Sequence, residues 1–141
     1  MTNAGGTLNC QGMKPILLAL PCLFVVLAAQ AAPNWTKAET VTVVMIDNKF
    51  QPDHVNFHAG HATKLVLKNQ GKEMHEFTAP DFLKASTVVD KKAVSNGGTD
   101  IVVQPHSTVL VRLVPGKAGD YDLTCADHDW DGMVGKITVQ P

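Results

Sequence analysis

The stretch from Cys125 to Met133, CADHDWDGM, constrains the fold more than any other part of the sequence. It places a thiol, an imidazole (His128) and a thioether within nine residues. Neighbouring side chains of a strand point to opposite faces, so a single strand cannot bring the three together. A loop between two strand ends can do so. The chain therefore needs strands that end and begin around this segment.

The ligand types in this stretch predict a copper site. Thiolate and thioether groups select reduced copper, and imidazole also suits the oxidised ion. A trigonal site of two His and one Cys with a weak axial Met is typical of blue-copper electron-transfer centres. The second His must come from elsewhere, and His75, in GKEMHEF, is the best candidate. Taken singly, Met133 could be core filling, His128 a surface residue and Cys125 a buried inert thiol; the combination favours copper.

Short runs rich in β-branched residues, separated by Gly, Pro and Asn turn signals, follow one another along the chain. They predict an all-β fold, a Greek-key β-sandwich or a small barrel. Residues 80–99 are ambiguous, with a helical turn expected at 81–85 and a loop at 95–98. The expected strands are residues 40–46, 55–58, 63–68, 74–79, 101–103, 108–114, 121–125 and 134–139.

The start of the chain predicts export. Lys14 precedes an apolar run over residues 16–29 that is shorter than the roughly 20 residues of a membrane span, and Ala29-Gln30-Ala31 is a small-x-small cleavage pattern. We expect residues 1–31 to be a signal peptide with an over-called extension, the true start being Met13, and residues 32–141 to be a single domain. An uncleaved anchor is the alternative. After cleavage we expect no stable membrane insertion and a periplasmic location.

Charge and cysteine usage limit the function classes. The chain has 12 Lys and Arg against 13 Asp and Glu, a net charge of −1 with no basic stripe, so nucleic acid is not an expected partner. Cys10 and Cys22 precede the expected cleavage point, which leaves Cys125 as the lone thiol of an exported domain. Such a thiol is vulnerable to oxidation unless something occupies it, and a bound metal would protect it.

The segments YDLTCADH (121–128) and GMVGKI (132–137) resemble the C-terminal region of the plastocyanin/azurin group of cupredoxins. FQP at 50–52, Ala59-Gly60 and NQG at 69–71 are also similar, so the resemblance spans roughly residues 41–139. It implies a Greek-key β-sandwich and one type 1 copper ion, with His75, Cys125 and His128 in the trigonal plane and Met133 as the long axial contact. It also implies that the backbone at Asn69 bridges the ligand loops, and that a backbone N–H donates to the Cys125 sulfur.

The resemblance implies an exported one-electron carrier, not an enzyme, that meets redox partner proteins transiently, and we expect a monomer. Thr124 and Ala126 flank Cys125 where multicopper oxidases have His ligands to a second centre. The departure from the family is MHEF at 74–77, where a small polar residue commonly follows the first His. It is similar to cupredoxin-like proteins of metal uptake, so a periplasmic copper-handling or metal-uptake accessory role is the alternative. Met74 and Glu76 remain further ligand candidates, and a Cys-His nucleophile is disfavoured by the tight Cys125–His128 spacing.

The remaining histidines and acids have separate interpretations. His54 and His58 would stand about 13 Å apart along a strand and cannot share an ion. His58 and His61 flank a turn and could. His106 follows Pro105 in an expected turn and should be solvated. The run Asp127-x-Asp129-x-Asp131-Gly132 partly matches a calcium loop but lacks its final Glu, so we interpret it as an acidic rim for a basic redox partner, with Trp130 as a docking contact or loop packing.

Overall fold

The structure is a computed structural model that describes Met1 and residues 32–141. The expected signal peptide, the alternative start at Met13 and the other two cysteines lie outside the described residues. Trp35, the first residue of the first element, has the Arg112 guanidinium 5.7 Å from its ring centroid.

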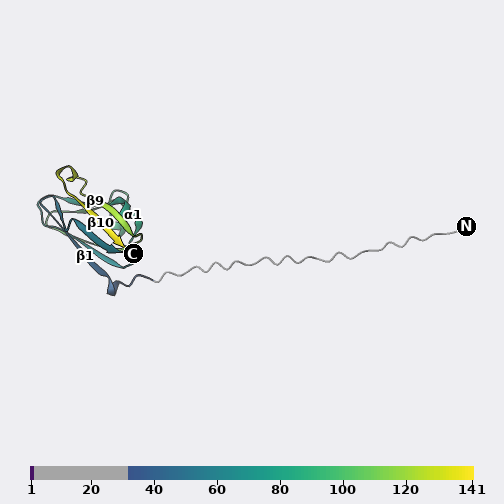
Figure 1. Cartoon of the computed structure of the whole chain (residues 1–141). Coiled ribbons are helices and arrows are strands. Elements are labelled where there is room, and N and C mark those ends of the chain that lie inside the picture. The colour runs from purple at the N-terminus through teal and green to yellow at the C-terminus, as the bar shows by residue number, and fades with distance from the viewer. Residues whose placement is uncertain (2–31) are drawn as a thin grey trace. The chain divides into compact units, whose positions relative to one another are not determined.

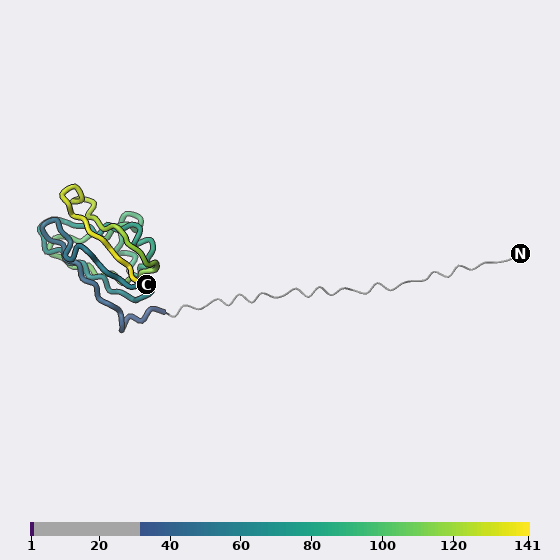
Figure 2. The backbone as a smooth tube through the Cα atoms, in the orientation of Figure 1, coloured from purple at the N-terminus to yellow at the C-terminus, as the bar shows by residue number. Residues whose placement is uncertain are grey.

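The described residues form two five-stranded sheets that pack into a β-sandwich (Figures 1 and 2), as the sequence predicts. The first sheet has the order β2-β1-β4-β8-β6 and the second the order β3-β10-β9-β5-β7. Many spatial neighbours are not consecutive in sequence, as Greek-key connections require. The strands are β1 (Glu39–Ile46), β2 (Lys49–Gln51), β3 (His54–His58), β4 (Thr63–Asn69), β5 (His75–Thr78), β6 (Ser86–Val88), β7 (Asp100–Val103), β8 (Thr108–Pro115), β9 (Gly119–Thr124) and β10 (Val134–Gln140).

Helical structure is short and lies between the strands. One α-helix, α1 (Pro80–Ala85), is present in the described residues, where the sequence predicts a helical turn at 81–85. Pro80 occupies its first turn, where the missing N–H costs nothing. Single 3-10 turns are η1 (Trp35–Lys37), η2 (Lys91–Ala93) and η3 (Asp129–Asp131).

Two parallel pairs fix the long axis of the domain. Strand β1 runs parallel to β4, with Glu39 opposite Thr63 and Met45 opposite Asn69. Strand β10 runs parallel to β3, so that Gln140 lies opposite His58. Figure 2 shows the yellow-green loop that precedes β10 at one end of the domain and the C-terminus at the other. The start of β1 and the end of β3 therefore lie far from that loop.

The core follows from alternation along the strands. In β4 the odd-numbered residues Leu65 and Leu67 are fully buried, whereas Lys68 is exposed. Ile137 and Val139 of β10 are buried in the same way, as the period-2 pattern predicts. Aromatic rings join the sheets, since the ring centroids of Phe50 on β2 and Phe77 on β5 lie 6.4 Å apart. This packed interior holds the strand ends that carry the candidate site.

Candidate metal centre

The loop between β9 and β10 is closed by its own backbone. The Cys125 N–H donates to the Met133 carbonyl at 3.0 Å, and the Met133 N–H donates to the His128 carbonyl at 3.0 Å. The His128 N–H donates in turn to the Cys125 carbonyl at 3.0 Å. Gly132 ends η3 with a φ of 84°, a left-handed conformation that glycine adopts without a steric cost. The loop therefore curls its three candidate ligands around one point.

His75 reaches the same point from a neighbouring strand. It is the first residue of β5 and pairs with Val103, while Thr78 at the other end of β5 pairs with Thr124, the last residue of β9. The strands are antiparallel, so β5 begins beside the loop that follows β9. The fold thus brings together two segments that are 50 residues apart in sequence.

Three donor atoms converge. The Cys125 Sγ lies 4.0 Å from His75 Nδ1 and 3.4 Å from His128 Nδ1. The ligand atoms of the three side chains lie within 4.8 Å of one another, and the two imidazole centroids are 4.8 Å apart. His75 and Cys125 are buried, and the His128 side chain is 12 % exposed. Met133 is fully buried and its backbone contacts Cys125, as described above.

The Cys125 sulfur accepts a backbone hydrogen bond from the Glu76 N–H at 3.3 Å. Burial raises the pKa of the Cys125 thiol, and backbone N–H groups of Glu76, Asp127 and His128 act in the opposite direction. These donors favour the thiolate, which is the form that binds metals. The resemblance implied that the backbone at Asn69 bridges the ligand loops, and this is wrong. The Asn69 N–H donates to the Ser107 carbonyl instead.

The side chain of Asn69 connects the loop before His75 with strand β7. Its Nδ2 donates to the Glu73 carbonyl at 2.7 Å and to the Val103 carbonyl at 2.9 Å, and its Oδ1 accepts from the Gly71 N–H at 2.9 Å. Asn69 is 2 % exposed, so these bonds are shielded from water. They fix the loop that leads into His75 against β7.

The two imidazoles differ in environment. Burial lowers the pKa of His75, with the proximity of His128 acting in the same direction. His75 is therefore held neutral, the form that donates a lone pair to a metal. His128 Nε2 lies 3.0 Å from the carboxylate of Glu73, which is 69 % exposed. His128 is thus the candidate ligand nearest to solvent.

Glu76 and Met74 have less direct contact with the candidate metal site. The Glu76 carboxyl is buried, and burial together with Asp127 and Asp100 raises its pKa. Its carboxylate does not belong to the converging group, so its contact with the site is the backbone N–H on the sulfur. Met74 is half-buried beside His75.

The donor set fits one copper ion. A thiolate, two imidazoles and a nearby buried Met are the groups that blue-copper sites use. Structural zinc sites prefer four Cys or His ligands, and this cluster offers three. The donor atoms lie close enough together for a small shift to bring them around one ion.

The surface near the site carries exposed carboxylates and two exposed apolar side chains, Trp130 and Val134. Trp130 is 79 % exposed and its Nε1 donates to the Asp127 carbonyl at 2.9 Å. The Asp131 carboxylate accepts from Asn48 Nδ2 at 2.7 Å. Within the described part of the chain, the carboxylates of this rim do not converge as calcium ligands do.

The other histidines lie away from the converging group. His54 Nε2 lies 2.9 Å from Thr138 Oγ1, and His106 is exposed. His58 and His61 both contact Glu39, at 3.1 and 2.8 Å. This second cluster is considered below.

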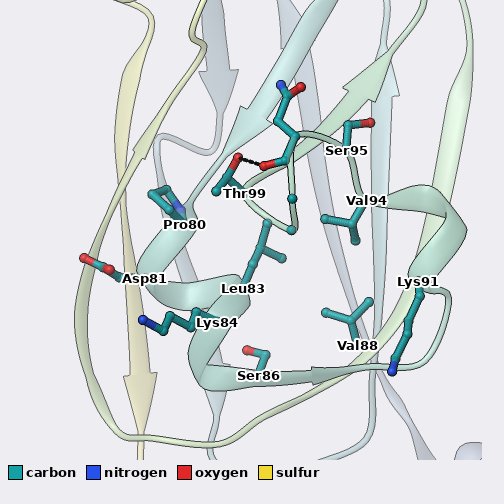
Figure 3. A pocket seen from close by; sticks show the side chains of 13 residues that line it. Pro80, Asp81, Leu83, Lys84, Ser86, Val88, Lys91, Val94, Ser95 and Thr99 are labelled. Atoms are coloured by element: carbon teal, nitrogen blue, oxygen red, sulfur yellow. Dashed lines mark hydrogen bonds between the residues drawn. The ribbon is translucent and has the colours of Figure 1, made fainter.

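A surface pocket is separate from the converging group. It has a volume of about 820 Å³ and lies between α1, β6 and the loop at 95–99 (Figure 3). Leu83, Val88 and Val94 line it together with Lys84 and Lys91. His75, Cys125, His128 and Met133 are not among its lining residues. Among the described residues, helices that are long and apolar enough to cross a bilayer are absent.

Comparison with known proteins identifies the family. A family model of the cupredoxin-like domain matches residues 16–139. Plastocyanin of Rumex obtusifolius is 33 % identical over 91 residues, which cover 64 % of this chain and 87 % of that protein. The copper-resistant cuproprotein CopI of Pseudomonas aeruginosa is 27 % identical, with 80 % of this chain and 81 % of CopI covered.

Solved structures give the same fold. Auracyanin B superposes with a TM-score of 0.56 at 20 % identity, covering 80 % of this chain and 94 % of that one. Reduced auracyanin of the photosynthetic bacterium Roseiflexus castenholzii gives a TM-score of 0.57 at 16 % identity, covering 74 % and 98 %. With the match of the family model over most of its length, the chain belongs to the cupredoxin-like domain family.

Proposed function

We propose that the protein is an exported mononuclear type 1 copper protein that carries one electron at a time. His75, Cys125 and His128 are the equatorial ligands, and Met133 is the axial ligand. The convergence of three donor atoms within 4.8 Å is the observation that carries this proposal. The similarity to plastocyanins supports the proposal, since this chain belongs to the cupredoxin-like domain family.

The surroundings of the cluster suit electron transfer. Bound copper supplies a one-electron couple between its cuprous and cupric states. The chain holds His75 and Cys125 on buried strand ends and leaves an edge of His128 near solvent. Rigid donors change little between oxidation states, and His128 gives an electron a short path to a partner. Thr124 and Ala126, on either side of Cys125, carry no metal-ligating side chain towards a second redox centre.

The partners and location follow from the same proposal. A monomer meeting redox partners transiently needs an exposed face near His128, and Trp130 with the carboxylates around it provides one. The carboxylates would attract a basic partner over a distance set by ionic strength. The expected signal peptide places the protein in the periplasm.

A second candidate function is copper handling or service as a metal-uptake accessory. The likeness to the copper-resistant cuproprotein CopI favours it, and so does the buried Glu76 carboxyl beside the ligand Cys125. A carrier of copper ions must release its cargo, whereas an electron carrier retains its metal through many cycles.

Reconstitution with copper tests both functions. Cupric salt is added to the purified full chain, and the visible spectrum and the reduction by ascorbate are recorded. We expect an intense blue charge-transfer band that bleaches on reduction and returns on oxidation. Cys125→Ser should lose this band while the far-ultraviolet circular dichroism stays that of a β-protein. His54→Asn, an exposed histidine outside the cluster, is the matched control and should keep it.

Two outcomes would overturn the proposed electron-carrier function. A weak d–d band alone would favour copper handling. An intense band that disappears for good because copper leaves the protein on each reduction would also favour copper handling. An electron carrier must keep its metal in place through each cycle.

A further inference from the structure

A second group of potential ligands lies outside the centre described above. The Glu39 carboxylate places Oε2 3.1 Å from His58 Nδ1 and Oε1 2.8 Å from His61 Nδ1. The two imidazoles are stacked, with centroids 5.3 Å apart and an angle of 30° between the rings. In the described part of the chain, this trio and the centre around Cys125 are the two groups whose three donor atoms lie within 4.8 Å.

The fold holds the three residues at one end of the sandwich. Glu39 begins β1, its N–H donating to the Ala62 carbonyl at 2.9 Å. His58 ends β3, and His61 follows it through a tight turn in which the His61 N–H donates to the His58 carbonyl at 3.3 Å. Gly60 has a φ of 76°, which a turn of this shape requires, and its N–H donates to the Pro115 carbonyl. The ligand positions are thus fixed by backbone contacts of several strands.

The group is accessible and carries a negative charge. The side chains of Glu39, His58 and His61 are 35, 42 and 59 % exposed. Hydrogen bonds from His61 and His58 hold the pKa of the Glu39 carboxyl below its usual value. A hollow of about 280 Å³ beside the group is lined by Glu39, His61 and Lys37, among others. An ion can therefore reach the group from solvent, and water can complete its coordination.

We propose that Glu39, His58 and His61 form a second metal site that binds a divalent transition-metal ion, with zinc or cupric ions as the favoured class. Two imidazoles and one carboxylate are ligands that both ions accept. Ligand atoms around a tetrahedral ion with bonds of about 2.1 Å stand about 3.4 Å apart, and the Glu39–His separations of 3.1 and 2.8 Å need a small opening to reach this. The hydrogen bonds to Glu39 are replaced by bonds to the ion.

The second site is independent of the first. Gln140 of β10 lies opposite His58, whereas Val134 at the other end of β10 follows Met133 directly. Seven residues of strand put the two sites about 20 Å apart. The inference therefore stands whether or not the centre around Cys125 transfers electrons.

The experiment uses the full chain loaded with one equivalent of copper at the Cys125 centre and then passed over a chelating resin. The thiol then does not compete, and the second site is free of copper before zinc is added. Zinc chloride is titrated into this protein by isothermal calorimetry, while the copper absorption is recorded. We expect one zinc ion per chain and an unchanged spectrum. Removing even an indirect partner of a metal ligand costs 10- to 100-fold in affinity, so His61→Asn and Glu39→Gln should each weaken zinc binding by at least about tenfold.

Control variants separate ligation from folding. His54→Asn and His106→Asn remove histidines that lie outside the group and should leave zinc binding unchanged. The copper absorption, from a site at the far end of the domain, reports that each variant is folded. Absence of zinc binding to the copper-loaded chain, or equal binding by His61→Asn, would overturn the proposal. Where a variant loses the copper absorption too, His58→Asn provides the second test of the same ligand set.

Discussion

The environment of Cys125 is set for a metal rather than for acid–base chemistry. Burial raises the pKa of its thiol, while the N–H of Glu76 contacts the sulfur at 3.3 Å. An anionic sulfur at this position therefore needs a cation beside it as well as its backbone donors. Burial keeps His75 neutral, which is the form of the imidazole that binds a metal ion.

Met133→Gln should keep copper bound and lower the reduction potential, because the axial ligand tunes it and an amide oxygen favours the cupric state. We expect a drop of more than about 59 mV, which is tenfold in a one-electron equilibrium. Protein-film voltammetry of the copper-loaded chain measures it.

Met74→Gln is the matched control, since Met74 is half-buried beside His75. Its potential should stay within experimental error of the parent. An unchanged potential in Met133→Gln with a drop in Met74→Gln would assign the axial position to Met74.

Asn69 makes three hydrogen bonds that no aliphatic side chain replaces. Asn69→Ala leaves buried carbonyl and N–H groups without partners, and each such group costs about 1–3 kcal/mol. We expect the free energy of unfolding of the copper-free protein to fall by at least about 2 kcal/mol in urea denaturation.

Asn56→Ala, on the exposed face of β3, provides the comparison for Asn69. Its stability should change by less than about 0.5 kcal/mol. Similar losses in both variants would mean that the side-chain bonds of Asn69 do not stabilise the fold.

The candidate ligands could be predicted from the sequence because metal binding depends on their side chains, which the sequence shows directly. Cys125, His128 and Met133 are close in sequence, and His75 is identified by resemblance. The hydrogen bond from the Glu76 N–H to the sulfur could not be predicted from the sequence, because every residue except Pro has the same backbone N–H group. Its direction depends on where β5 begins relative to the loop after β9, and only the assembled sheet determines that.

At the scale of elements, the eight longer strands were predicted to within about two residues at each end. Strands β2 and β6 were missed, and both are three-residue strands at the edges of the first sheet. A strand of three residues is too short to show the alternation over four or more residues that reveals a half-buried strand. The partly helical segment before β6 was ambiguous for the same reason.

The connection between β6 and β8 is fixed by an ion pair. The Asp90 carboxylate accepts from the Arg112 backbone N–H at 2.8 Å and from its guanidinium Nη2 at 2.6 Å. These bonds hold the pKa of Asp90 below its usual value. Above the pKa of about 3.9 that Asp90 has in the unfolded chain, these bonds contribute their full share to the free energy of unfolding. This contribution is lost as the pH falls through the lower pKa that Asp90 has in the folded chain.

Asp90→Asn should therefore lower the melting temperature at pH 7 by a few degrees, because the amide cannot replace both carboxylate oxygens. The difference from the parent should shrink as the pH falls below about 4, where Asp90 of the parent becomes protonated. Differential scanning calorimetry across this range measures it. Asp53→Asn, an exposed carboxylate, should show no such convergence.

At the scale of the whole molecule, the proposed copper centre would link segments from different parts of the chain. His75 lies on β5 and the other candidate ligands lie between β9 and β10, so an ion bound among them would connect these strands of the second sheet. Copper should bind the folded chain and not an unfolded one in which these segments are apart. At a free copper concentration of 100 times the dissociation constant, this adds about 2.7 kcal/mol to stability.

Thermal unfolding of the copper-free and copper-loaded protein tests this coupling. The melting temperature should rise on loading, and Cys125→Ser should remove most of the rise. His54→Asn should retain it. A rise of equal size in Cys125→Ser would place the stabilising ion elsewhere, and Glu39→Gln would then show whether the second cluster holds it.

Five backbone hydrogen bonds lie within the segment from Cys125 to Met133 and join that segment to itself. Its neighbours, Thr124 and Val134, are a facing pair in the β9–β10 ladder. The segment can therefore be exchanged for one of another length, provided that its two ends still meet across this pair. The β-sandwich would stay unchanged, and the exchanged loop would determine how the bound metal is coordinated.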